Sequence, residues 1–387
     1  MYDNFFYPYE KAKLWTGNMI GLSLSNFLLY ASLYVMLPVL PSWIVQHWYC
    51  SYAEAGAVVA AFGLGLFVSG PFNSYLIDTF KRKSVCIVAM LLFISSNLLY
   101  LYLSAVWQIV LVRFIQGGLF SVITMTTGST LAIDITASRR RTDANIAFAW
   151  VGRLGMVAGV ALGIYIYPYW SFHHVVYACV VLGTGALLLI LALRVPFRAP
   201  LRVSWFSLDR FLLPRALWPG LNMMLVAIVL GILIAHICNE WFYICMWVGL
   251  VVSLLLSCYV LFHVPSRSEV ELGQAAMIGG LLLLLFSNGL MTSSISGVLL
   301  GIGIGITVSR FFIKMINLPM HCERGTGNNT YQLLWETGII GGFLFENMWT
   351  EMHPNAIYWI CIGFSVAGLL MYELFTHSWY YRRMEEK

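Results

Sequence analysis

The chain of 387 residues is 60% hydrophobic and only 10% charged, with a formal net charge of +5. Soluble globular chains carry about 25% charged residues, so these charges are too few to cover a water-soluble protein of this length. Helices of about 20 apolar residues can cross a bilayer, because they satisfy their own backbone hydrogen bonds. The composition therefore excludes a water-soluble fold and predicts an all-α protein whose main partner is the lipid bilayer.

Apolar segments follow one another along the chain, separated by short polar or proline-containing breaks. The twelve predicted transmembrane helices are residues 15–39, 52–76, 84–105, 107–135, 144–167, 172–194, 216–237, 241–263, 272–291, 296–318, 327–349 and 355–376. These spans use most of the chain, so no soluble domain of about 100 residues fits between them.

The positions of the basic residues predict the orientation. If the N-terminus is cytoplasmic, 19 of the 22 Lys and Arg residues fall in inner segments, and no outer loop carries any. The remaining three, Arg113, Arg153 and Arg310, lie within spans. The positive-inside rule then places both termini in the cytoplasm. The basic balance is an orientation signal, and we expect no nucleic-acid partner.

The longest inner segment divides the chain into two sets of six spans. We expect an N-terminal six-helix bundle at 1–195, a cytoplasmic linker at 196–215 and a C-terminal six-helix bundle at 216–387. Transporters built from structural repeats show this plan, with the substrate site near the membrane midplane.

A segment between the second and third spans resembles the signature loop of the major facilitator superfamily. Within residues 70–83, Leu76, Asp78, Arg82 and Lys83 match positions of that loop. The resemblance implies a conformational gate, in which this loop latches the two halves together in the outward-facing state. A basic loop that only fixes the orientation is the alternative.

Further motifs of the same family follow in order. Residues 113–117 are similar to the R-x-x-Q-G motif of proton-coupled members, and Asp134 stands where the family ends its fourth span and adds to the gate. Glycines at 155, 159 and 163 are close to the glycine-rich motif of exporters, although Val160 replaces its proline. Their spacing also lets helix backbones approach closely.

The resemblance implies a 12-span fold and secondary active transport of a small solute by alternating access. The matches in the fourth and fifth spans favour proton-coupled export of a small amphipathic or drug-like compound by an antiporter of the bacterial inner membrane. Uptake of a small metabolite by the same fold is the alternative, and a membrane-embedded enzyme or sensor is a third class. We expect no enzymatic activity, no cofactor and no obligatory protein partner, because no ATP-binding or catalytic motif occurs.

Two arginines inside spans are candidates for substrate binding or proton coupling. A charge within the bilayer costs at least about 2.5–3.5 kcal/mol, so such a residue should face the bundle interior or a water-filled cavity. Arg113 either faces the central cavity or is a structural arginine that bonds carbonyl groups or extends outward to the membrane surface. Arg153 is a candidate on the same grounds, and it could equally pair with Asp143 or with a neighbouring helix.

Glu336 is the acidic candidate for proton coupling. Asn329, Gln332 and Glu336 form one polar stripe on an otherwise apolar span. Burial disfavours the charged form of a carboxyl group, so such a group can gain and lose a proton near neutral pH. The alternatives are a structural carboxylate paired to Arg310 and a carboxylate on the wall of an inner vestibule.

Polar residues on two further spans complete the candidate site. In the family that the chain resembles, spans 1, 4, 7 and 10 line the cavity, which makes Asn26, Tyr30 and Asn222 substrate contacts along with Arg113. Single polar residues in spans more often join neighbouring helices. We expect no metal site. Cys50 and Cys238 both fall in predicted outer loops, so a disulfide between them is an open alternative to two free thiols.

Overall fold

The computed structural model describes residues 13–196, 204–208, 211–286, 289–319, 324–349 and 354–385. Within these residues every regular element is a helix. The α-helices are α1 (Gly17–Met36), α2 (Leu40–Trp48), α3 (Tyr52–Thr79), α4 (Arg82–Leu99), α5 (Val106–Thr126), α6 (Ala132–Asp134), α7 (Arg141–Tyr169), α8 (Phe172–Ala192), α9 (Leu217–His236), α10 (Glu240–Leu255), α11 (Ser266–Phe286), α12 (Leu290–Asn317), α13 (Arg324–Met348), α14 (Pro354–Met371) and α15 (His377–Glu385).

Eleven helical segments of the described residues are long and apolar enough to cross a membrane. They correspond to eleven of the twelve predicted spans. The remaining predicted span, 327–349, is helix α13, which has 25 residues but a more polar sequence. Its crossing of the membrane stays a prediction, as does the cytoplasmic position of the termini.

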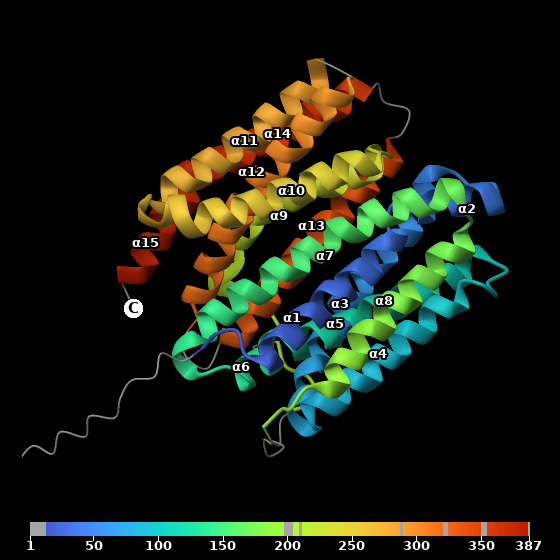
Figure 1. The fold of residues 1–387 in the computed structure, drawn as a ribbon, viewed down its shortest axis with the longest axis horizontal. Helices are drawn as coiled ribbons and strands as arrows, with labels where there is room; N and C mark the ends of the chain where they lie inside the picture. Colours follow the sequence, from blue (N-terminus) through green and yellow to red (C-terminus); the bar gives the residue numbers. More distant parts are fainter. Residues whose placement is uncertain are drawn as a thin grey trace, which may run out of the picture.

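The helices form two groups (Figure 1). Between residues 17 and 192, α1 packs on α7 and α8, while α3 and α4 pack on α5. Between residues 217 and 385, α9 packs on α13 and α14, while α10 and α11 pack on α12. The predicted linker, 196–215, connects the groups in the chain, although its residues 197–203 and 209–210 lie outside the described residues.

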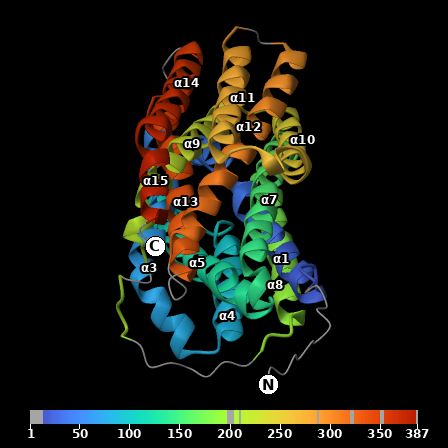
Figure 2. The same ribbon diagram turned by 90° about the vertical axis from the view of Figure 1, so that its left-hand side faces the viewer.

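Two helix pairs form the seam between the groups. Helix α13 packs against α3, and α10 packs against α7. Figure 2 shows α13 running beside α3 and α5. We call the end of the bundle that holds α6 and α15 the gate end and the opposite end, which holds α2, the far end (Figure 1).

Among the described residues, three π-helical turns occur, and each lies near the gate end. The turns are η1 (Thr127–Leu131) between α5 and α6, η4 (Leu256–Val260) after α10 and η6 (Tyr372–Thr376) between α14 and α15. Such turns contain i→i+5 bonds and are rare inside α-helices.

Glycines bring α1 and α7 into backbone contact. A Cβ atom on Gly159 would lie 2.6 Å from the carbonyl oxygen of Ala31, and one on Gly163 would lie closer still to that of Val35. A side chain has no room at these positions. Close packing therefore accounts for the glycine motif that the sequence shows in this helix.

The disulfide considered from the sequence is not formed. Cys50 and Cys238 are both free thiols. They lie in separate links, the first between α2 and α3 and the second between α9 and α10, so each belongs to a different helix group.

We expect Gly163→Ala to lower the free energy of unfolding by about 1–3 kcal/mol, because the added methyl group overpacks a backbone contact. Gly279→Ala is the matched control, since nothing lies within 4 Å of a Cβ atom at that position. The control should be neutral or stabilising by up to about 1 kcal/mol. Thermal unfolding of the two variants in detergent measures the difference, and equal midpoints would contradict the close contact.

The predicted orientation can be tested with a membrane-impermeant maleimide on right-side-out vesicles. After Cys50 and Cys258 are replaced by Ser, the exposed residue Cys238 should be labelled, and Cys238→Ser should lose the signal. Neighbouring protein atoms and, to a lesser extent, the charge of Glu346 raise the pKa of the Cys238 thiol. The reactive thiolate therefore becomes more abundant as the pH rises, and labelling is best done at about pH 8.5.

A cysteine in the predicted cytoplasmic linker provides the matched control for orientation. Ser204→Cys, placed in the Cys238→Ser background at an exposed position, should react only after the vesicles are permeabilised. The reverse pattern for the two cysteines would mean that the chain is inserted with its termini outside.

Candidate functional site

A buried tyrosine of one helix group contacts a buried carboxyl group of the other. The hydroxyl of Tyr34 on α1 donates a hydrogen bond to Oε2 of Glu336 on α13, at 2.7 Å. Tyr30 lies one turn earlier on α1, and its ring stacks on that of Tyr34 with 6.3 Å between the centroids. Because Glu336 is only 1% exposed, this contact joins the two groups away from solvent.

Arg113 and Glu336 face the same small cavity. Together with Tyr34 and apolar side chains they line a space of about 10 Å³, which is about the size that one water molecule needs. Arg113 on α5 is 2% exposed, and its Nη1 donates to Oε1 of Gln116 at 3.4 Å. The arginine and the carboxyl group therefore lie across one space without a direct ion pair between them.

A second small cavity lies beside Arg153 of α7. Its lining includes Asn26, Tyr30 and Gln332, and its volume is also about 10 Å³. Arg153 is 3% exposed, donates from Nη1 to the hydroxyl of Ser309 at 3.0 Å and lies 4.8 Å from the ring centre of Trp150. This arginine thus connects α7 of one group to α12 of the other.

Six of the seven residues predicted for substrate binding or proton coupling line these two cavities. They are Asn26, Tyr30, Arg113, Arg153, Gln332 and Glu336, and we call them the central cluster. The seventh, Asn222, lies elsewhere: it is fully buried on α9, and its amide is hydrogen-bonded to Thr376 at 3.0 Å. This bond joins α9 to the π-turn η6 within the second group, and substrate contact by Asn222 stays a prediction.

Several atoms of the central cluster make no hydrogen bond to protein. They are Oδ1 of Asn26, Nε and Nη2 of Arg113, Nε and Nη2 of Arg153, Nε2 of Gln332 and Oε1 of Glu336. A buried polar group without a partner costs about 1–3 kcal/mol, and a charged one costs more. These donors and acceptors are therefore available to a polar ligand or to water.

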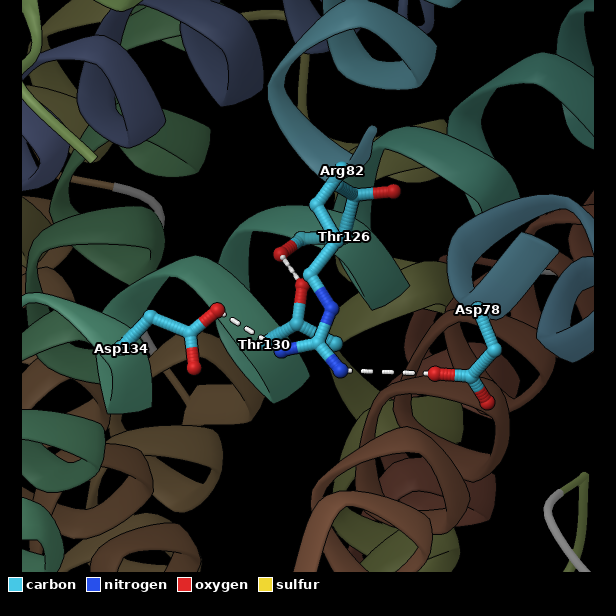
Figure 3. Close-up of polar contacts among 5 residues, drawn as sticks. All are labelled: Asp78, Arg82, Thr126, Thr130 and Asp134. Carbon is cyan, nitrogen blue, oxygen red and sulfur yellow. Dashed lines mark hydrogen bonds and ion pairs between the residues drawn. The ribbon is translucent and has the colours of Figure 1, made fainter. Parts of the chain in front are cut away.

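At the gate end, one arginine bridges two buried carboxylates (Figure 3). Arg82 at the start of α4 contacts Oδ2 of Asp134 on α6 through Nη1, at 2.7 Å, and Oδ1 of Asp78 on α3 through Nη2, at 3.3 Å. The carboxylate side chains are 1% and 5% exposed, respectively. Three helices of one group are thereby held together at their ends.

Lys83, predicted as part of the same gate, makes a different contact. Its Nζ donates to the carbonyl oxygens of Leu191 and Leu193, at 2.8 and 2.7 Å. A cation is favourable at a helix C-terminus, where carbonyl groups lack partners. Lys83 therefore fixes the end of α8 against α4 and does not contact Asp78.

The two helix groups also touch near the gate end. The hydroxyl of Ser129, within the π-turn η1, donates to the carbonyl oxygen of Gly325 at 3.0 Å. The amide of Asn328 donates to the same hydroxyl at 3.2 Å. Since Ser129 and these α13 residues belong to different groups, the seam is closed at this level.

The second helix group carries a buried ion pair that the sequence reasoning missed. Glu269 in the first turn of α11 pairs with Arg310 of α12, and Glu269 is 1% exposed. Lys314, one turn further along α12, lies 4.5 Å from the ring centre of Tyr380. The alternative that Arg310 pairs with Glu336 is therefore wrong, and so is a pair between Arg153 and Asp143, whose partner is Arg140 at 2.8 Å.

The fold and the site together define a polytopic helical membrane protein whose two helix groups meet at a buried polar centre. Residues 22–309 match the sequence profile of the Major Facilitator Superfamily. Because this match spans well over half of the chain, the protein belongs to that superfamily and functions in membrane transport.

Solved structures of transporters share the fold at low sequence identity. A mutant of the nucleoside transporter NupG and the human organic anion transporter MFSD10 each give a TM-score of 0.70 at 14% identity, over 92% of this chain. The alignments cover 99% and 98% of those chains. A segment of 123 residues is 30% identical to Multidrug resistance protein 2 of Bacillus subtilis (strain 168), covering 31% of this chain and 30% of that protein.

We expect Arg82→Ala to lower the free energy of unfolding by roughly 3 kcal/mol, because it leaves two buried carboxylates without their shared cation. The value is at the low end for buried pairs, since the Arg82 side chain is 20% exposed. Arg382→Ala, on the exposed face of α15, should change stability by less than about 0.5 kcal/mol. Thermal unfolding compares the two, and equal effects would show that the bridge contributes nothing.

Proposed function

We propose that this protein is a secondary active transporter that exports a small amphipathic or drug-like compound in exchange for protons. The observation that carries the proposal is the hydrogen bond between Tyr34 and Glu336, which joins the two helix groups at a buried carboxyl group. A group that exchanges a proton at this seam can couple its charge to the separation of the groups.

The physical basis of coupling is the cost of burying a charge. A neutral Glu336 carboxyl group tolerates the closed seam, where only one oxygen has a protein partner. An ionised carboxylate needs further hydrogen bonds or a counter-ion. Losing the proton therefore favours a conformation in which water or Arg113 reaches the carboxylate, and gaining it favours closure.

Solute binding requires the helix groups to move apart. The two central cavities have about 10 Å³ each, whereas sites for small molecules measure about 300–1,000 Å³. On separation, the unpartnered amide atoms of Asn26 and Gln332 and the Arg153 guanidinium line the space that opens. These groups supply the polar contacts, and Tyr30 supplies an aromatic surface.

The gate residues can stabilise one of the two conformations between which the transporter alternates. In our proposal, the bridge from Arg82 to Asp78 and Asp134 keeps the ends of α3, α4 and α6 together while the seam at Ser129 is closed. Breaking the bridge would loosen these ends as the groups rotate. Lys83 contributes by anchoring α8.

Export is supported by the kinship with a protein named for multidrug resistance over about a third of the chain. We propose an inner-membrane location with both termini cytoplasmic, which agrees with the distribution of Lys and Arg. Import of a small metabolite would use the same helices in the opposite direction.

The function can be tested in everted membrane vesicles that carry an imposed pH gradient, reported by a fluorescent acridine. Ethidium, chloramphenicol and tetraphenylphosphonium serve as probe exports, and nucleosides and amino acids serve as probe imports. A drug-like probe that dissipates the gradient only when the protein is present would support proton-coupled export. If only metabolites do so, the export proposal is wrong.

We expect Glu336→Gln to abolish the dependence of transport on the pH gradient, since an amide cannot release a proton. Glu346→Gln is the matched control, because this carboxyl group lies on the same helix and is 7% exposed, but it pairs with His236 at 3.2 Å. The control should retain coupling. Counterflow of a labelled probe, which needs no gradient, should persist in both variants, and unchanged proton coupling in Glu336→Gln would remove that residue from the mechanism.

A further inference from the structure

A cavity of about 450 Å³ lies on the seam between α7 and α10, outside the central cluster. Its lining includes Phe27 of α1, Leu162 and Tyr165 of α7, and Glu240, Tyr243 and Trp247 of α10. The volume falls within the range of sites for small molecules. We call it the α7–α10 vestibule.

The two sides of the seam differ. On the other side, α3 and α13 are in close contact: a Cβ atom on Gly56 would lie 2.6 Å from Cβ of Asn347, and one on Gly63 would touch Ile340. On the vestibule side, Tyr165 is 53% exposed and Ile244 is 42% exposed. Since both side chains belong to apolar spans, the vestibule opens toward the surrounding lipid.

The lining of the vestibule is mostly apolar and includes one acidic residue. Glu240, in the first turn of α10, is the charged side chain in its lining, and it makes no ion pair with the described residues. The sequence has no Lys or Arg between Lys13 and Lys81, between Arg153 and Arg194, or between Arg215 and Arg267. The helix segments that form the vestibule therefore offer Glu240 no basic partner along their own length.

Aromatic rings complete the environment for a cation. Phe27, Tyr165, Tyr243 and Trp247 line the same space, and a cation over an aromatic face gains about 0.5–2 kcal/mol. The hydroxyl of Tyr243 donates to the carbonyl oxygen of Leu233 at 2.7 Å, and its side chain is fully buried. The rings that a ligand can reach are therefore those of Phe27, Tyr165 and Trp247. A ligand with an apolar body and one positive charge matches this set of groups.

The vestibule adjoins the central cluster. Phe27 follows Asn26 of the cluster on α1, and Ala158 of the vestibule lies five residues after Arg153 on α7. Five helical residues span about 7.5 Å. A ligand beside Ala158 is thus about one and a half helical turns along α7 from Arg153 of the central cluster.

We propose that the α7–α10 vestibule binds an amphipathic cation, with its ammonium or phosphonium centre near Glu240 and its apolar groups on the aromatic rings, as it passes between the lipid and the central cluster. This inference rests on the proposed transport function and adds a substrate class and an access route. The affinity of an uncharged lipid chain for the same space would not depend on the charge of Glu240. This dependence therefore distinguishes a bound cation from a bound lipid chain.

The test is equilibrium binding of radiolabelled tetraphenylphosphonium to the purified protein in nanodiscs. Glu240→Gln should weaken binding about two- to fivefold, as expected for the loss of a partly exposed charge pair. Ile244→Trp, which fills the vestibule from α10, should weaken it further. Ile295→Trp, at a position of α12 with similar exposure, and Glu346→Gln are the matched controls and should bind as the parent protein does.

A neutral probe of similar shape, triphenylphosphine oxide, should bind Glu240→Gln and the parent protein equally. If tetraphenylphosphonium does not bind the parent protein, or binds both vestibule variants unchanged, the proposal is wrong. Equal weakening of both probes by Glu240→Gln would also overturn it, because the residue would then act on the shape of the site and not through its charge.

The vesicle assay separates this inference from the proposed function. Tetraphenylphosphonium could dissipate the pH gradient in a way that Glu336→Gln abolishes, while Glu240→Gln leaves its affinity unchanged. The transport function would then be supported and the vestibule proposal would be wrong. If binding depends on Glu240 while no probe moves protons, the vestibule stands as a cation site and the coupled export fails.

Discussion

The cost of placing a charge in lipid organises this molecule. A charged side chain at the centre of a bilayer is unfavourable by at least about 2.5–3.5 kcal/mol, and the structure keeps such side chains against protein. Arg113, Arg153 and Glu336 are each at most 3% exposed, and all three lie where the helix groups face one another. The helices are therefore turned so that their polar stripes meet, which leaves apolar side chains for the lipid. The same seam is the place that water can reach when the groups separate.

Each helix group has an ion pair between the start of one helix and a later helix, and the signs of the two charges are reversed between the groups. In the first, an arginine at the start of α4 pairs with an aspartate on α6. In the second, a glutamate in the first turn of α11 pairs with an arginine of α12. Each pair joins the beginning of one helix to the later part of the next long helix in the chain. The arrangement is the same while the charges are exchanged, so it depends on having a pair there and not on which partner carries which sign.

Eleven of the spans and the residues that form the central cluster could be predicted from the sequence, because both depend on local patterns. A run of apolar residues predicts a span wherever it lies, and the stripe that ends at Glu336 stands out within one helix. Residues whose roles depend on which helix ends meet could not be assigned in this way. Lys83 lies next to Arg82 in sequence but contacts the end of α8, and Asn222 contacts a residue 154 positions later. The α7–α10 vestibule exists only through packing, since no segment that lines it carries a motif of its own.

The π-turn η1 sets the direction, around the helix axis, in which the side chains of the following helical residues point. A π-turn accommodates one more residue than an α-helical turn, and one residue corresponds to about 100° around the helix axis. Asp134 comes three residues after η1 and aims its carboxylate at Arg82. Removing a single residue from Thr127–Leu131 would keep the segment helical but would point that carboxylate toward a different neighbour. The bridge at the gate end therefore depends on the π-turn, which sets the direction of the Asp134 side chain, as much as on the charged residues themselves.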